Sequence, residues 1–144
     1  VIGKKGLALN KKEGDKKTPK GLFGIDKLFF RKDRIKKVKT KLKSIPIRRN
    51  MGWCDDTTNA RKYNRLIKVS KKVKYEKMYR SDSSYDLVIP IKYNFLKPQL
   101  KKGSAIFLHV TKNYKPTAGC IALNKNDFLI MLKIINKKTK IKII

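Results

Sequence analysis

Hydrophobic periodicity constrains this chain most, because only one stretch of it has the spacing of an amphipathic helix. Asn124 can cap that helix, and Asp127 lies in its first turn as a short acid. Four apolar residues then recur at i, i+3, i+4 and i+7: Phe128, Met131, Leu132 and Ile135. The spacing predicts one helix over about residues 125–136.

The other apolar residues fall into short runs separated by turn residues, which is typical of strands. These runs are residues 22–25, 28–30, 66–69, 85–94, 103–110 and 140–144. Residues 31–50 alternate basic and apolar positions and favour exposed strands or an edge loop, whereas the polar and aromatic residues 51–65 indicate a structured loop. Many short strands with one late helix predict a mostly β fold, either a curved mixed sheet or a two-sheet sandwich, with the helix packed outside.

The length of the chain fits a single domain over residues 1–144. It has 144 residues, 40% of them hydrophobic, so it can bury a core without disulfides. No apolar run approaches the roughly 20 residues that span a bilayer. The chain begins at Val1 without an initiator Met, so we expect that it is truncated at the N-terminus. We expect a monomer.

The charge of the chain is extreme, with 39 Lys+Arg against 10 Asp+Glu and a net charge of +29. Such a charge would point to a polyanionic partner. The lysines, however, occur in short runs from end to end and not in one block or stripe. This distribution favours a solvated surface, and we expect no specific nucleic-acid partner.

The candidate chemistry lies in one region. The only histidine, His109, lies at the end of a predicted buried strand, and Cys120 follows it after ten residues. An imidazole that takes the thiol proton makes cysteine a nucleophile, and Gly119 lets the backbone bend so that N–H groups face an oxyanion. An inert buried thiol and a core histidine are the alternative. The two cysteines, Cys54 and Cys120, lack metal-ligand spacing, and we predict no metal site.

These residues resemble a known signature. The runs 106–109 and 116–123 are similar to the His…(Ser/Thr)-His-Gly-Cys-(Ile/Val)-Arg motif of the YkuD-type L,D-transpeptidase catalytic domain. Residues 18–21, Thr-Pro-Lys-Gly, resemble its N-terminal Thr-Pro-x-Gly turn. Residues 52–56, 63–65, 86–88 and 93–94 resemble a compact bacterial subgroup. The similarity runs from about residue 3 to about residue 135.

The resemblance implies a role for each matching residue. Cys120 would be the acylated nucleophile, His109 its general base, and the N–H groups of Gly119 and Cys120 part of the oxyanion hole. Two positions depart from the family pattern. Ala118 stands where the family has a second histidine, and Ala122 stands where it has an arginine. His109 is therefore left as the sole imidazole.

The resemblance also implies the reaction. The thiolate would attack a carbonyl of a peptidoglycan stem peptide at its bond to a D-amino acid, leaving a thioester that an amine from another stem resolves. Water in place of that amine would make the enzyme an L,D-carboxypeptidase or amidase. No cofactor is required, the location would be the periplasm or cell envelope, and a carbapenem should form an adduct.

Further residues are candidates for the walls of the substrate groove: Tyr63, Asn64, Tyr93, Asn94 and Thr117. For the first four, turn residues with local hydrogen bonds are the alternative interpretation. We expect a structural role for Cys54, unbonded to Cys120, with Trp53 packed nearby and Asp55 and Asp56 accepting loop N–H groups.

Two rival functions stay open. One is an inactive basic protein that binds nucleic acid or an anionic wall polymer through its lysines. The other is a cysteine peptidase or amidase on ordinary L-peptides, which would need a third group to orient the histidine.

Overall fold

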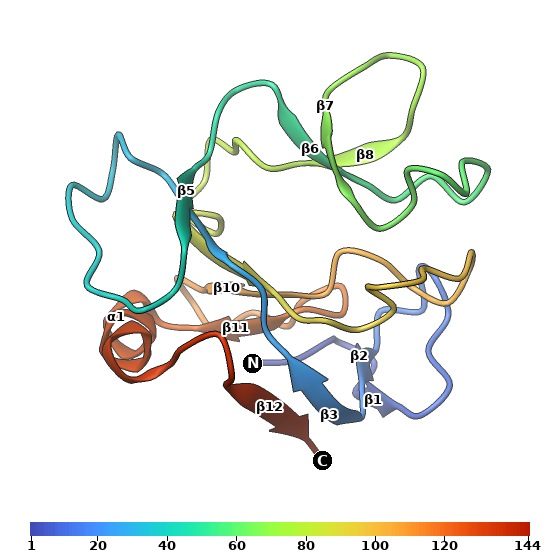
Figure 1. Cartoon of the computed structure of the whole chain (residues 1–144). Helices are drawn as coiled ribbons and strands as arrows, with labels where there is room; N and C mark the ends of the chain where they lie inside the picture. The colour runs from blue at the N-terminus through green and yellow to red at the C-terminus, as the bar shows by residue number, and fades with distance from the viewer.

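A mixed five-stranded sheet forms the centre of the protein, which the computed structural model describes over residues 1–144 (Figure 1). Its order is β11-β10-β9-β4-β5. The strands are β4 (Leu28–Phe30), β5 (Ser44–Pro46), β9 (Leu87–Pro90), β10 (Phe107–Val110) and β11 (Ile121–Leu123). The pairs β10–β11 and β4–β5 are parallel and the others antiparallel. Strand β9 is buried along its whole length, as its continuous apolar run predicts.

The helix α1 (Lys125–Ile134) covers one face of this sheet. Asn124 caps it, its side chain accepting the Asp127 N–H at 2.9 Å. Phe128 and Leu132 are fully buried in a core cluster that also contains Leu108 and Val110 of β10 and alternate residues of β9. The helix ends two residues before position 136, because Ile135 has an extended backbone.

A three-stranded antiparallel sheet lies on the opposite side (Figure 1). Its strands are β6 (Met51–Cys54), β7 (Leu66–Lys68) and β8 (Tyr75–Lys77), with β6 in the middle. The prediction of a loop over 51–65 is therefore wrong for the first four residues. The sequence signal was misleading because a glycine in a strand suggests a break. Gly52 instead lets the Tyr75 ring pack closely against β6, since a Cβ at position 52 would lie 2.6 Å from Cδ2 of Tyr75.

Two small sheets complete the fold. Strands β1 (Leu7–Ala8) and β2 (Thr18–Pro19) pair in parallel, and β3 (Gly21–Gly24) pairs antiparallel with β12 (Lys140–Ile143). Within residues 31–50 only β5 pairs, at the edge of the large sheet, which agrees with the predicted exposed strands or edge loop. The predicted fold class, mostly β with a single helix, is confirmed.

The second core cluster fills the space between the large sheet and the β6–β8 sheet. It contains Phe107 of β10, Trp53 of β6 and Cys120, which lies just before β11. The nucleophile candidate is thus held between two sheets. None of the helical structure reaches the length and apolarity that a membrane crossing needs.

Candidate active site

Strand register brings His109 and Cys120 to one face of the large sheet. Leu108 pairs with Ile121 across the parallel β10–β11 ladder, so Cys120 is level with Phe107, whose N–H donates to Sγ at 3.4 Å. Residues two apart on a strand point to the same face. His109 therefore lies diagonally opposite Cys120 on that face.

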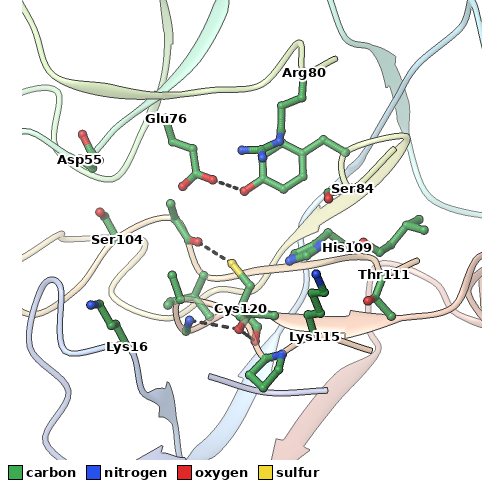
Figure 2. Close-up of a pocket in the computed structure, with 18 of the residues that line it drawn as sticks. Lys16, Asp55, Glu76, Arg80, Ser84, Ser104, His109, Thr111, Lys115 and Cys120 are labelled. Atoms are coloured by element: carbon green, nitrogen blue, oxygen red, sulfur yellow. Dashed lines mark hydrogen bonds between the residues drawn. The ribbon is translucent and has the colours of Figure 1, made fainter. Parts of the chain in front are cut away.

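Both side chains line a cavity of about 570 Å³. Figure 2 shows the sulfur of Cys120 near the centre of the view, with the His109 ring extending toward it from the neighbouring strand. Lysines of the 111–117 loop, Lys112 and Lys115, line the same cavity. The structure thus brings the two side chains that the sequence singled out to one cavity.

The loop that carries Cys120 is fixed by two threonine hydroxyls. Thr18 is fully buried; its Oγ1 donates to the Gly119 carbonyl at 2.9 Å and accepts the Gly3 N–H at 2.8 Å. Thr117 Oγ1 donates to the Cys120 carbonyl at 2.6 Å. Gly119 itself has φ +139°, and a Cβ there would lie 2.9 Å from the Lys17 carbonyl oxygen. A glycine is required at this bend.

The two backbone donors expected to stabilise an oxyanion differ in availability. The Gly119 N–H, expected to face the oxyanion, donates to Thr117 Oγ1 at 3.1 Å in the free protein. Its short loop makes an ST-type turn, and the turn uses that donor. The Cys120 N–H has no hydrogen-bond acceptor in the protein and is the donor that remains available.

The sulfur of Cys120 is held by two backbone groups. Its S–H donates to the Ala105 carbonyl at 3.2 Å, and Sγ accepts the Phe107 N–H. Burial raises the pKa of the Cys120 thiol to about 12, and the carboxyl of Glu76 acts in the same direction. The Phe107 N–H lowers it only in part. The free protein therefore holds a neutral thiol at pH 7.

The His109 ring is also neutral at pH 7. Burial lowers its pKa, and Nδ1 lies 2.9 Å from the carbonyl oxygen of Val110. If Nδ1 carries the proton, that carbonyl fixes the tautomer and leaves Nε2 free to accept a proton. The ring packs against Tyr85, with ring centres 5.4 Å apart.

The motif spacing predicts a direct or nearly direct hydrogen bond between His109 and Cys120, and no direct one is present. The sulfur bonds to Ala105 and Phe107, and the imidazole bonds to Val110. Because each partner has its own backbone hydrogen bond, the two neutral groups face the same cavity without an ion pair. Such a pair can still transfer a proton when a substrate closes the geometry.

A family comparison matches almost the whole chain. The model of the YkuD family, described as the L,D-transpeptidase catalytic domain, covers residues 1–143. The chain belongs to the YkuD family. Members of this family act on peptidoglycan stem peptides in the cell wall. No curated protein and no solved structure gives a significant match.

This YkuD domain departs from the family motif at two alanines near the sulfur. Ala118 lines the cavity, so the second family histidine is replaced by a methyl group at its wall. Ala122 is buried and pairs with His109 across the β10–β11 ladder. Neither position can supply an imidazole or a guanidinium to the substrate.

Four of the five predicted groove residues lie outside the cavity: Tyr63, Asn64, Tyr93 and Asn94; the fifth, Thr117, lines it. Tyr63 is fully buried and its O–H donates to Glu13. Asn64 is also buried, and its Oδ1 accepts the N–H groups of Ala105 and the Trp53 ring. The polar groups of both side chains are engaged within the protein in this structure.

Tyr93 and Asn94 likewise serve the loop that follows β9. The Tyr93 O–H donates to the Lys102 carbonyl at 2.7 Å, and Asn94 has φ +49°, with its Nδ2 donating to the carbonyls of Gln99 and Gly103 at 2.9 Å each. The alternative interpretation, turn residues with local hydrogen bonds, holds for these positions. A Tyr-Asn pair in sequence fits either role, so the sequence alone left both interpretations open.

The cavity also contains residues that the sequence did not single out. Glu76 of β8 accepts a hydrogen bond from the Tyr85 O–H, and burial raises the pKa of Glu76. The Arg80 guanidinium lies 5.0 Å from the centre of the Tyr85 ring. One signal was present: Glu13 and Glu76 are the only glutamates in a chain with 39 basic residues, and both line this cavity.

Cys54 lies apart from this chemistry. It is fully buried on β6, and both cysteines are free thiols, so no bond joins Cys54 to Cys120. Asp56 accepts loop N–H groups from Thr58 and Lys74, as expected. Asp55 does not act as expected: its buried Oδ1 has no partner, and burial raises its pKa. No cluster of three or more His, Cys, Asp or Glu is arranged to hold a metal ion.

Proposed function

We propose that this chain is one catalytic domain that acts as a cysteine-dependent L,D-transpeptidase, with Cys120 as the acylated nucleophile and His109 as the general base. The observation that carries the proposal is the diagonal placement of these two side chains on one face of adjacent parallel strands, in a cavity of about 570 Å³. The substrate is the stem peptide of peptidoglycan, and the setting is the periplasm or cell envelope.

The first step transfers an acyl group to sulfur. A stem-peptide carbonyl enters the cavity, the thiol proton passes to Nε2 of His109, and Sγ bonds to the carbonyl carbon. The Cys120 N–H faces the developing oxyanion, since the Gly119 N–H is engaged by Thr117. Collapse breaks the C–N bond, His109 returns the proton to the leaving D-amino acid, and a thioester remains.

The second step resolves the thioester. An amine of a second stem attacks the thioester carbonyl and gives a proton to His109; the C–S bond then breaks, the sulfur of Cys120 takes that proton back, and an amide cross-link remains. Water in the same position gives a shortened stem, which is the carboxypeptidase outcome. The backbone carbonyl of Val110 acts as the third orienting group, so the site needs no Asn or Asp partner for His109.

A carbapenem tests the nucleophile directly. Its strained β-lactam carbonyl opens when a thiolate attacks, so intact-mass spectrometry should show one adduct on the native chain. The adduct should be absent in Cys120→Ala and much slower to form in His109→Ala. Cys54→Ser is the matched control, because Cys54 lies outside the cavity and its loss should leave the adduct nearly unchanged.

Stem-peptide turnover decides the reaction. Incubation with tetrapeptide stems should release the terminal D-residue, and the ratio of cross-linked to hydrolysed product separates transpeptidase from carboxypeptidase. An adduct that maps to Cys54, or a folded protein without stem turnover, would favour the rival basic binding protein. That rival also predicts polyanion binding with steep salt dependence that Cys120→Ser leaves intact.

A further inference from the structure

The backbone of Ala105, two residues before β10, has an unusual conformation at the centre of the active site. Ala105 is 7% exposed and has φ +50°, the left-handed region that costs a non-glycine residue about 1–2 kcal/mol. In this conformation its carbonyl accepts the S–H of Cys120 at 3.2 Å. Such a conformation persists only where the surrounding structure holds it.

Asn64 is the side chain that holds Ala105. Its Oδ1 accepts the Ala105 N–H at 3.0 Å and the Trp53 indole N–H at 2.8 Å. Its Nδ2 donates to the carbonyls of Asn94 at 2.7 Å and Tyr93 at 3.2 Å. Asn64 is 4% exposed and has φ +54°. With all four bonds made inside the protein, this amide ties the loop before β10 to β6.

We propose that Asn64 is a positioning residue that aims the Ala105 carbonyl at Cys120 and so keeps the proton on the sulfur while no substrate is bound. The inference rests on the proposed function in taking Cys120 as the nucleophile. A carbonyl oxygen can only accept a hydrogen bond. It therefore stabilises the S–H form and repels an ionised sulfur at the same position.

Several titratable groups also face the sulfur, and their effects partly cancel. They are Glu76 of β8, Arg80 beyond β8, Tyr85 before β9, His109 of β10, and Lys11 of the N-terminal loop. The carboxyl of Glu76 raises the pKa of Cys120, whereas Arg80 and Lys11 lower it. The Ala105 carbonyl is uncharged, so its preference for the S–H form does not depend on the titration of these neighbours.

This arrangement separates resting reactivity from catalytic reactivity. In the empty site the S–H bond stays directed at the Ala105 carbonyl. Electrophiles in solution therefore encounter the neutral thiol, which reacts slowly, and not the thiolate. When a substrate carbonyl carbon reaches Sγ, the S–H bond breaks, the proton moves to Nε2 of His109 and the S–C bond forms. The Ala105 oxygen then loses its donor without any change elsewhere in the loop.

Alkylation by iodoacetamide measures the resting state, because the reagent reacts with the thiolate, forms an S–C bond and releases iodide. The rate at Cys120 would be followed by peptide mapping from about pH 6 to 11 in three variants. Asn64→Gly and Asn64→Ser both remove the amide that accepts the Ala105 N–H, and glycine fits the φ of +54° at this position. Asn94→Gly is the matched control, since Asn94 has φ +49° and ties the same loop but makes no bond to Ala105.

Freeing the carbonyl should lower the pKa of Cys120 by about one unit, which gives a roughly tenfold faster reaction at pH 8. Asn64→Gly and Asn64→Ser should both show this increase, and Asn94→Gly should match the wild type. If Asn64→Gly does not fold, Asn64→Ser decides alone. A wild-type rate in a folded Asn64 variant, or an equal increase in Asn94→Gly, overturns the proposal.

The same measurement keeps this inference apart from the proposed function. Stem turnover that survives in Cys120→Ser would rule out Cys120 as the nucleophile. The alkylation profiles would still test whether Asn64 and the Ala105 carbonyl hold the proton on the sulfur. Conversely, unchanged profiles with turnover lost in Cys120→Ser would remove only the role of Asn64.

Discussion

Thr18 donates a 2.9 Å hydrogen bond to the carbonyl of Gly119, across 101 residues of sequence. The same hydroxyl accepts the Gly3 N–H, so the N-terminal segment and the Cys120 loop form one buried unit. This explains why the Thr18-Pro19 turn, which is distant from Cys120 in sequence, occurs together with the Gly119-Cys120 pair. The threonine fixes the peptide that precedes Cys120.

Thr18→Val should therefore lower both stability and turnover, although valine and threonine have nearly the same shape. It removes one acceptor and one donor from a buried position, and the cost in unfolding free energy should be about 1–3 kcal/mol. Stem turnover should fall on the order of tenfold or more, because the nucleophile loop loses its anchor. Chemical denaturation and initial rates would measure both effects.

Thr18→Ser is the control for this pair of measurements, since it keeps the hydroxyl and removes only a methyl group. Its turnover should stay near that of the wild type. Equal turnover in the valine and serine variants would show that the hydroxyl does not position Cys120.

The pH dependence of turnover should follow His109. The ring must be neutral to accept the thiol proton, and burial lowers its pKa from 6.5 in the folded protein. The acid limb of the rate profile should therefore have its midpoint below 6.5. A midpoint above 6.5 in initial rates would contradict the neutral resting imidazole.

The same shift affects stability with a defined sign. Because the folded pKa of His109 is depressed, the unfolded chain binds this proton more readily. The contribution of His109 is therefore lost as pH falls below 6.5. Unfolding curves of the wild type and His109→Ala should differ progressively in this range, with the wild type losing more stability toward acid.

Sequence patterns predicted the elements that depend on neighbouring residues, such as a helix cap or a regular apolar spacing. The helix α1 follows from the Asn124 cap and its apolar spacing, and the parallel pair β10–β11 carries the residues that the His-Cys spacing singled out. Strand β6 was missed because position 52 needs a glycine for a tertiary reason: the ring of Tyr75 packs against it. A single sequence does not contain that contact in readable form.

The sequence singled out Cys120 and His109, which line one cavity, but it did not single out most of the residues around them. Asn64 and Tyr63 looked like groove residues because polar and aromatic side chains in a loop serve binding as readily as loop structure. Their roles depend on partners 29 to 50 residues away, such as Glu13 and Tyr93. Glu76 reaches the cavity only because β8 pairs with β6, and local patterns predicted neither of these two strands.

Glu76→Gln gives a direct test of the electrostatics around Cys120. The Glu76 carboxyl raises the pKa of the thiol, second only to burial, and it accepts the Tyr85 O–H. Glutamine keeps the shape and the acceptor but removes the charge. Iodoacetamide alkylation of Cys120 should therefore shift to lower pH by roughly 0.5–1 unit.

Glu13→Gln is the matched control for that measurement. Glu13 is the other glutamate of the chain and lines the same cavity, but it bonds to Tyr63 and Ser104 and makes no hydrogen bond to the sulfur or to Tyr85. Its alkylation midpoint should stay at the wild-type value. If both variants shift equally, the effect comes from the net charge of the cavity. If Glu76→Gln shifts upward or not at all, Glu76 does not hold the proton on Cys120, and burial with the Ala105 carbonyl accounts for the neutral thiol.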